Sequence, residues 1–479
     1  MTAILHPLII VWIGLPFFLG FLIYLIPQMD RAFALVMVVA SAVFAGLLFV
    51  QPTSVDLSLL DHFGVTLSAD VLSAYFILTN ALVTAAVLLY CWWSEKSAFF
   101  YAKLAIAHGS LNAAFICADF ISLYVAIEVL SIAAFLLIAY PRTDRTIWVG
   151  LRYLFASNTA MLFYLMGAAL VYQANHSFSF AGLQVAPPEA IALILLGLLA
   201  KGGIFLPGLW LPVTHSEAET PVSALLSGVV VKVGVFPLIR CALLVEEINP
   251  IVRLFGVATA LLGVSYAVFE KDTKRMLAFH TISQMGFVLA APVAGGFYAL
   301  THGLVKSCLF LISGNLPTRN FKDLQQKTID SRIWTALAIA SLSISGLPLL
   351  AGFVAKAWTL KAVLPWQVFA MSLASVGTAI SFAKFIFVPR GGEQEIKPGF
   401  AGAVGLLLGG LVVANLVYPQ AYTLAEMTKA LITIGGGWLT YLLVFGRITV
   451  KLPRMLEQFE QLIGMMSLML ILLFWMVVT

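Results

Sequence analysis

The most regular feature of this chain is a succession of apolar stretches of about 20 residues, separated by short polar segments. A helix of about 20 apolar residues crosses the hydrocarbon core of a bilayer, and unbroken apolar runs differ from the alternating pattern of a membrane β-barrel. The pattern therefore predicts an all-α polytopic membrane protein with about 14–16 transmembrane helices. We place sixteen spans near residues 8–26, 31–50, 70–92, 99–117, 120–139, 147–172, 189–209, 221–243, 250–269, 276–294, 296–314, 332–364, 366–388, 398–418, 427–446 and 460–479.

Two of these spans contain clusters of glycine and proline. The span 332–364 is too long for one straight crossing and carries such a cluster at 346–352, and the span 189–209 carries another at 202–207. Glycine and proline free backbone groups that a continuous helix would satisfy, and this is tolerated only beside protein or a water-filled cavity. We expect both helices to break near the middle of the membrane.

The same two regions form an internal repeat. Lys201 precedes Lys232 by 31 residues, Lys356 precedes Lys384 by 28, and the sequences KVGVFP and KFIFVP begin at Lys232 and Lys384. The offset is five spans, and an odd offset inverts the second unit relative to the first, as in many transporters. Coincidence is the alternative, and the shared helix breaks weigh against it. We divide the chain into N-terminal helices (1–97), a first five-helix repeat (98–245), a second, inverted repeat (246–390) and C-terminal helices (391–479).

Basic residues predict the orientation of these helices. Cytoplasmic loops collect lysine and arginine, and the loops after even-numbered spans offer little beyond Arg240, Arg253 and Lys429. We therefore expect the loops after odd-numbered spans to face the cytoplasm and both termini to face away. These loops hold Arg31, Lys96, Lys103, Arg142, Arg145, Lys271, Lys274, Arg275, Arg319, Lys322, Lys327, Arg332, Arg390, Lys397, Arg447, Lys451 and Arg454.

Composition agrees with a membrane protein and narrows its chemistry. The 479 residues are 61% hydrophobic and only 10% charged, against about 25% charged in soluble domains. The four cysteines form no CxxC pair or Cys/His cluster, so we expect no metal site. No nucleotide, flavin, haem or iron–sulfur motif is present, so we expect no cofactor and no covalent catalysis by this chain alone. The basic residues follow the loops and form no patch for nucleic acid.

Charged residues inside the apolar spans are the main functional signal. A lysine at the bilayer centre costs roughly 2.5–3.5 kcal/mol, so five of them with Glu128 cost on the order of 15 kcal/mol without compensation. A desolvated lysine can exchange its proton near neutral pH, whereas an arginine cannot. Lysine at all five positions therefore favours a proton path, with snorkelling to the interface as the alternative for Lys384. The five are Lys201, Lys232, Lys306, Lys356 and Lys384.

A carboxylate and three histidines complete the candidate path. Glu128 lies about eight residues into its span, roughly 12 Å deep, and needs a cationic partner, for which Lys201 is the natural candidate. His302 and Lys306 share one helix face, and His280 is one helix earlier; histidine can pass protons between water chains. Hydrogen-bonded packing is the alternative for these histidines, and for His108 we favour it.

At these residues the chain resembles the antiporter-like membrane subunits shared by respiratory complex I and the multi-subunit Mrp sodium/proton antiporters, over roughly residues 70–390. It is most similar to the Mrp D subunit. The resemblance rests on Glu128, Lys201 with Trp210-Leu-Pro212, Thr220-Pro-Val-Ser-Ala224 with Lys232-Val-Gly234, the segment from Lys274 to Gln284, His302 with Lys306, and Gly352-Phe-Val-Ala-Lys356.

The resemblance implies a role for each of these residues. Glu128 and Lys201 would form a switching pair, Lys232 would sit centrally, His302 with Lys306 would bridge two half-channels, and Lys356 would gate the exit. The chain departs from the complex I members in lacking their histidine before Trp210, in the unusual loop 213–220, and in two helices beyond a fourteen-helix core without a long lateral helix.

Three functions remain open on this basis. The leading one is a proton-translocating subunit of an Mrp-type Na⁺(K⁺)/H⁺ antiporter, working with other membrane subunits in a prokaryotic plasma or thylakoid-type membrane. The second is a proton-pumping subunit of a complex I-like NAD(P)H or ferredoxin–quinone oxidoreductase. The third is a membrane subunit of an inorganic-carbon uptake complex with a soluble zinc partner. The residues inside the chain would be nearly the same in the first two, so only the partners discriminate these.

Overall fold

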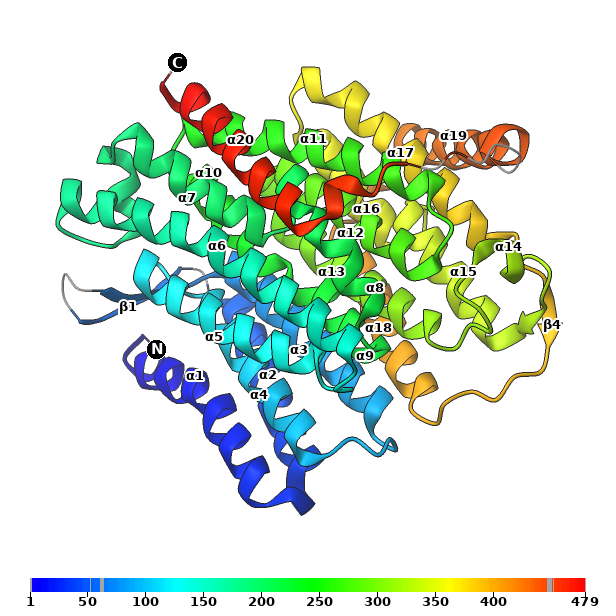
Figure 1. Ribbon diagram of the computed structural model, residues 1–479, viewed down its shortest axis with the longest axis horizontal. Helices are drawn as coiled ribbons and strands as arrows, with labels where there is room; N and C mark the ends of the chain where they lie inside the picture. Colours follow the sequence, from blue (N-terminus) through cyan, green and yellow to red (C-terminus); the bar gives the residue numbers. More distant parts are fainter. Residues whose placement is uncertain (1, 52, 61–63, 446–449, 451, 479) are drawn as a thin grey trace.

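A computed structural model describes residues 2–51, 53–60, 64–445, 450 and 452–478, so Arg447 and Lys451 lie outside the described residues. The chain is a bundle of long helices with little sheet (Figure 1). Its first half comprises α1 (Thr2–Leu25), α2 (Asp30–Val50), β1 (Val55–Leu60), β2 (Gly64–Ala69), α3 (Val71–Cys91), α4 (Ala98–Ala114), α5 (Phe120–Ile138), α6 (Asp144–Asn175), α7 (Pro188–Lys201), α8 (Leu211–Glu217), α9 (Thr220–Leu225) and α10 (Lys232–Leu244).

The second half begins after α10 and again consists almost entirely of helices. It comprises α11 (Ile248–Phe269), α12 (Thr273–Ala290), α13 (Pro292–Ser313), α14 (Phe321–Leu324), β3 (Ile329–Asp330), α15 (Ser331–Ser345), α16 (Ala351–Ala362), α17 (Pro365–Ile386), β4 (Arg390–Gly392), α18 (Phe400–Asn415), α19 (Leu424–Thr440) and α20 (Phe459–Val478).

Every predicted span coincides with a helix or a pair of helices, which confirms the all-α polytopic fold. Twelve segments among the described residues are long and apolar enough to cross a bilayer alone. The remaining predicted spans correspond to α4, α12, the α15–α16 pair and α18, which are shorter or more polar. The apolar pattern predicts no secondary structure between the second span (31–50) and the third (70–92). In the structure this segment forms the antiparallel hairpin β1–β2.

Both predicted helix breaks are present. The helix α7 ends at Lys201 and is followed by a 3₁₀ turn at Leu206–Trp210. The helix α15 ends at Ser345, and the next residue, Gly346, closes it in the left-handed region with φ of 92°. A third interruption is a π-helical turn at Leu226–Val230, directly before Lys232. Each break leaves main-chain carbonyls that the helix no longer satisfies.

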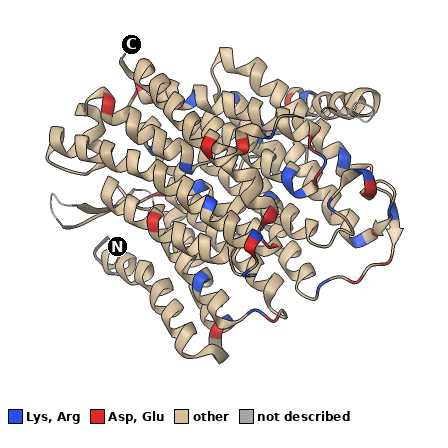
Figure 2. Ribbon diagram, in the orientation of Figure 1, with Lys and Arg blue, Asp and Glu red and all other residues tan. Residues whose placement is uncertain are grey.

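The loops collect on two opposite faces of the bundle. On one face, ion pairs join Lys96 to Glu219 at 2.6 Å and Arg319 to Asp272 at 3.0 Å. These residues all follow odd-numbered spans, and we call this the basic face. Figure 2 shows charged residues through the middle of the molecule and at the end that carries β4, with few at the end that carries β1. On the opposite face, which we call the hairpin face, Arg240 binds Asp70 at 2.5 Å, next to β2.

The broken helices run in opposite directions between these faces. The segment before α7 lies at the hairpin face. There the backbones of Asp119 and Ser179 pair in an isolated antiparallel β-bridge, and the Gln184 side chain donates a hydrogen bond to the carbonyl of Leu244. The segment before α15 lies at the basic face, where β3 pairs with β4. The two broken helices therefore cross the bundle in opposite directions, as the five-span offset predicts.

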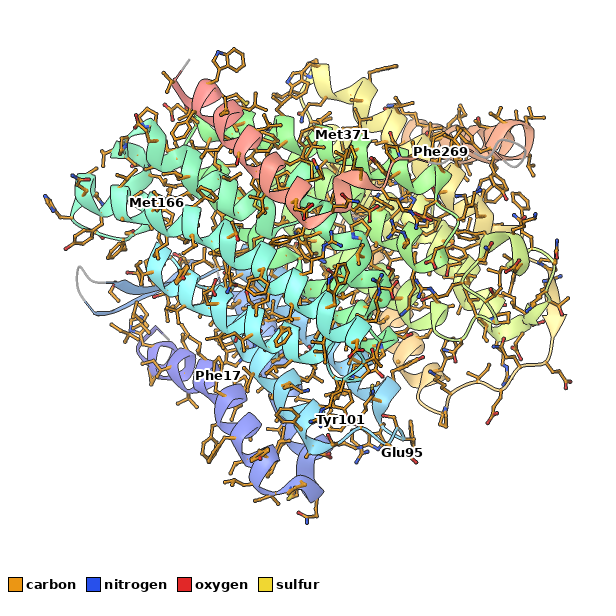
Figure 3. All side chains as sticks on the ribbon, viewed as in Figure 1. Phe17, Glu95, Tyr101, Met166, Phe269 and Met371 are labelled. Carbon is orange, nitrogen blue, oxygen red and sulfur yellow. The ribbon has the colours of Figure 1, made fainter. Side chains whose placement is uncertain are left out.

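The last two helices lie against different units. The helix α19 packs on α17, whereas α20 packs on α7 and the 3₁₀ turn that follows it, and Figure 1 shows the two at separate places on one side of the bundle. Between them, Glu457 accepts a 2.7 Å hydrogen bond from Arg275, which also pairs with Glu270 at 3.1 Å. Side chains fill the space between helices throughout (Figure 3).

Candidate functional site

Lys201 lies at the first helix break and is bound by hydroxyl groups. Its side chain is buried, and Nζ donates to Ser131 Oγ at 2.7 Å, Ser157 Oγ at 2.5 Å and the Tyr153 hydroxyl at 3.2 Å. The shortest of these contacts is the one to Ser157. Three neutral acceptors from α5 and α6 therefore hold this ammonium group in place.

The break itself depends on close backbone contacts. Gly203 has φ of 68°, and a Cβ on Gly208 would collide with the carbonyl group of Gly203. The indole of Trp210 donates to the carbonyl of Ala200 at 2.9 Å and so satisfies one of the groups that the helix end leaves free. These contacts fix the end of α7 and therefore the position of Lys201.

Glu128 does not form the expected direct pair with Lys201. No ion pair joins them within 4 Å, and Glu128 Oε1 is buried without a hydrogen-bond partner. Electrostatic attraction between the two charges remains. In this conformation the Lys201 ammonium is bonded to the hydroxyl groups and not to Glu128. The Glu128 carboxylate can therefore compete with these hydroxyl groups for the ammonium.

Lys232 occupies the centre of the bundle with no exposed surface. Its Nζ donates to the carbonyl of Gly228, which the π-helical turn leaves accessible, and lies 3.2 Å from His302 Nδ1. A direct Lys232–His302 contact joins the broken part of the first unit to α13 of the second. The sequence places both residues in the path but does not predict that they touch.

Near Lys306 lie several buried histidine ring nitrogens that have no hydrogen-bond partner. Lys306 donates to the carbonyl of Leu277 on α12. The remaining ring nitrogen of His302 and both ring nitrogens of His280 are buried without a hydrogen-bond partner, and the His280 ring packs on Phe382. Unpartnered buried polar atoms are rare in folded proteins and call for an explanation such as a relay or bound water.

Lys356 marks the second break, and its Nζ donates to the carbonyl of Ser345 at 3.2 Å. It also lines a cavity of about 270 Å³ between α15, α16, α17 and α19. No carboxylate of the described residues contacts its ammonium group within 4 Å.

Two secondary candidates have other roles in this geometry. Lys384 donates to the carbonyls of Ala267, Val268 and Glu270, so it caps the C-terminal end of α11. His108 bonds Ser41 Oγ at 2.9 Å and Thr84 Oγ1 at 3.2 Å and ties α2, α3 and α4 together. Both sets of contacts satisfy the side chains locally, which favours structure over relay.

The sequence reasoning missed His215. The segment 213–220 is expected to be a loop, but most of it forms the buried helix α8. The His215 ring is fully buried, both ring nitrogens lack partners, and the ring lies 6.1 Å from Trp210 and 6.2 Å from Phe310. Lys306 Nζ lies 5.3 Å from the same Phe310 ring. A histidine in a polar stretch directly after a helix break was the available signal.

Within the described residues, no group of three His, Cys, Asp or Glu side chains could hold a metal ion. The site is thus a row of amines, imidazoles and one carboxylate buried in a helical membrane domain. Such a row suits the movement of protons or small cations better than covalent chemistry.

The sequence matches the family described as "NADH:quinone oxidoreductase/Mrp antiporter, TM" over residues 117–381. It is 28% identical to the D subunit of a Na⁺/H⁺ antiporter from Alkalihalophilus pseudofirmus over 70% of this chain and 75% of that protein. It is 30% identical to the N subunit of an NADH-quinone oxidoreductase from Desulforudis audaxviator over 70% of this chain and 74% of that protein.

Solved structures share the fold at low sequence identity. A chain of the Mrp complex from Dietzia sp. DQ12-45-1b superimposes with a TM-score of 0.75 at 19% identity, covering 90% of this chain and 98% of that chain. A chain of the membrane-bound sulfane sulfur reductase, an archaeal respiratory membrane complex, gives a TM-score of 0.76 at 21% identity, with 90% and 99% coverage. The twelve apolar helices and these likenesses establish a multi-pass integral membrane protein.

Proposed function

Because the chain belongs to the NADH:quinone oxidoreductase/Mrp antiporter family of transmembrane proteins, we propose that it is a proton-translocating subunit of an Mrp-type Na⁺(K⁺)/H⁺ antiporter. The observation that carries the proposal is the buried contact between Lys232 and His302, 3.2 Å apart at the junction of two inverted units. A fixed structural counter-charge would need a carboxylate partner, whereas an amine beside an imidazole suits proton exchange.

The path that we propose starts at Glu128 and Lys201. When Glu128 attracts the Lys201 ammonium, the three hydroxyl contacts break; when Glu128 is neutralised, Lys201 returns to them. From Lys201 the line of buried groups passes Tyr153, Trp210 and His215 to Lys306. Internal water would complete the hops between groups that do not touch.

The second half of the path runs from α13 to the second helix break. His302 and Lys306 exchange protons with Lys232, and His280 lies within electrostatic range of both Lys306 and Lys356. Lys356 then passes the proton toward the hairpin face. Lys384 and His108 stay outside the path, since their contacts are those of a helix cap and a packing cluster.

We further propose that the chain works with other membrane subunits in a prokaryotic plasma or thylakoid-type membrane. Its relatives are named as subunits of larger assemblies. The basic face would be cytoplasmic and both termini would lie on the other side, because lysine and arginine collect in cytoplasmic loops.

The alternative is a proton-pumping subunit of a redox complex, since a relative of 30% identity is named as the N subunit of an NADH-quinone oxidoreductase. This relative fits no better than the antiporter D subunit, which is 28% identical over the same share of this chain. Identifying the proteins that co-purify with the tagged chain decides between them. Small antiporter subunits support the first function, and flavin, iron–sulfur or quinone-site subunits support the second.

The proton path itself is tested by Lys232→Ala in everted vesicles that contain the whole complex. We expect proton movement to be abolished while the complex still assembles, because the amine that contacts His302 is removed. Lys361→Ala, on the exposed end of α16, is the matched control. Wild-type proton movement in the Lys232 variant would refute the central role of this residue.

A further inference from the structure

The cavity beside Lys356 continues away from the proton path toward the hairpin face. Its volume of about 270 Å³ holds several water molecules, since each occupies roughly 30 Å³ in the liquid. An internal water chain needs room and polar partners, and the lining of this cavity mixes apolar side chains, among them Phe353, Leu360 and Ile432, with polar ones. The polar side chains that line it besides Lys356 are Ser345, Ser372, Ser375, Glu426, Lys429 and Thr433.

The direction of the cavity follows from the elements around it. The helix α16 runs from the break toward the hairpin face, where the carbonyl of Ala362 at its end accepts a hydrogen bond from Arg253. Glu426 is in the first turn of α19, which starts on that same face because α18 begins at the basic face and crosses the bundle. The cavity therefore connects the middle of the bundle with the hairpin face.

Glu426 supplies a carboxylate to this lining. Its side chain is 17% exposed, and Lys429, 71% exposed, binds it at 3.1 Å. Lys356 lies at the inner end, buried and bonded to a carbonyl. A buried amine on α16 and a partly exposed carboxylate on α19 thus line one cavity.

We propose that this cavity is the port through which Lys356 exchanges protons with the hairpin face, and that Glu426 is the proton acceptor at its mouth. The inference rests on the proposed function. It extends the path beyond the matched family region, which ends at residue 381, because α19 supplies the mouth. The Lys356 ammonium gives a proton to water in the cavity, the Glu426 carboxylate takes it up, and the neutral carboxyl then releases it to the bulk solvent.

Two sets of variants test the port in vesicles containing the assembled complex. Glu426→Gln should slow proton movement at least fivefold, and Glu426→Asp should restore most of the rate and shift its pH profile, which a merely structural residue would not do. In a second arm, Thr433→Cys places a thiol on the cavity wall. A charged, water-soluble methanethiosulfonate reagent added from the hairpin face should then block transport at least fivefold. The matched control is Leu431→Cys, on the exposed side of the same helix, which should leave transport unchanged.

The outcomes separate the port from the proposed function. If Lys356→Ala abolishes transport while Glu426→Gln runs at the wild-type rate, the port is wrong and the buried path stands. If Lys356→Ala itself transports normally, the proposed path fails. Should Glu426→Gln prevent assembly, the Thr433→Cys arm decides: an unreactive thiol, or a modified one without effect on transport, overturns the port.

Discussion

At the scale of single residues, the buried amines are bonded mainly to neutral oxygen atoms. Lys201 binds hydroxyl groups, and Lys232 and Lys356 bind carbonyls that a π-helical turn and a helix break leave free. The sequence predicts which lysines are buried, because apolar flanks are a local property. It does not predict their partners, because Ser131, Ser157 and Tyr153 meet Lys201 only after α5, α6 and α7 pack.

The first prediction concerns Glu128 and Lys201. Glu128→Gln and Lys201→Ala should each cripple transport, since the proposed switch needs both charges. If the two act as a unit, the double variant should be scarcely slower than either single one. Rates per assembled complex measure this, with the exposed Glu189→Gln as control. Losses that multiply would instead indicate two independent sites.

The second prediction separates relay from packing at His302. Glutamine keeps hydrogen-bonding capacity beside Lys232 but cannot carry the proton. His302→Gln should therefore slow transport at least tenfold, equivalent to a barrier increase of roughly 1.4 kcal/mol. His108→Gln provides the contrast: loss of its contacts to Ser41 and Thr84 should lower the melting temperature with little change in rate per complex. A normal rate for His302→Gln would remove this residue from the path.

At the scale of helices, glycine and proline clusters predict where α7 and α15 break, because the cause is local. The π-helical turn before Lys232, the hairpin β1–β2 and the buried helix α8 have no such local signal and depend on packing. The path of α20 is also set by distant contacts. Its entry segment is held by Glu457, whose carboxylate binds Arg275 of α12 and lies within electrostatic range of Arg152 on α6.

The third prediction tests this attachment. Glu457→Gln should lower thermal stability, because breaking a buried ion pair costs roughly 3–5 kcal/mol and leaves the arginines poorly neutralised. Glu460→Gln, exposed three residues later, should change little. Melting temperatures of the detergent-solubilised complex measure both. Equal melting temperatures would mean that α20 is held by its apolar contacts alone.

The same cluster has a defined pH dependence. Burial raises the pKa of the Glu270 carboxyl, but Arg275 and the amides of Lys271 and Asp272 outweigh burial and leave it below the ordinary value of 4.5. A lowered carboxyl pKa stabilises the folded chain above the unfolded pKa, and this stabilisation is lost as the pH falls through the folded value. The fourth prediction is that Glu270→Gln makes the melting temperature less sensitive to pH below about 4.5 than it is in the wild-type chain.

At the scale of the whole molecule, the number and parity of the spans could be predicted from the sequence because apolar length and loop charge both follow from the bilayer. Loops after odd-numbered spans should all lie on one face of the membrane. The ion pairs Lys96–Glu219 and Arg319–Asp272 each join two such loops, as this expectation requires. Which face meets the cytoplasm depends on insertion, so it stays a prediction from the positive charges alone.

The last prediction tests that orientation with single cysteines. Lys327→Cys lies in an exposed part of the loop before β3, on the basic face, and Ala174→Cys is exposed at the end of α6, on the hairpin face. Ala174 is preferable to the neighbouring His176, whose φ of 52° would strain a substitution. A membrane-impermeant thiol reagent should label position 174 in intact cells and position 327 only in everted vesicles. The four native cysteines are buried, so the unsubstituted chain should give little background. The reverse pattern would place the basic face outside and with it the mouth of the Lys356 port in the cytoplasm.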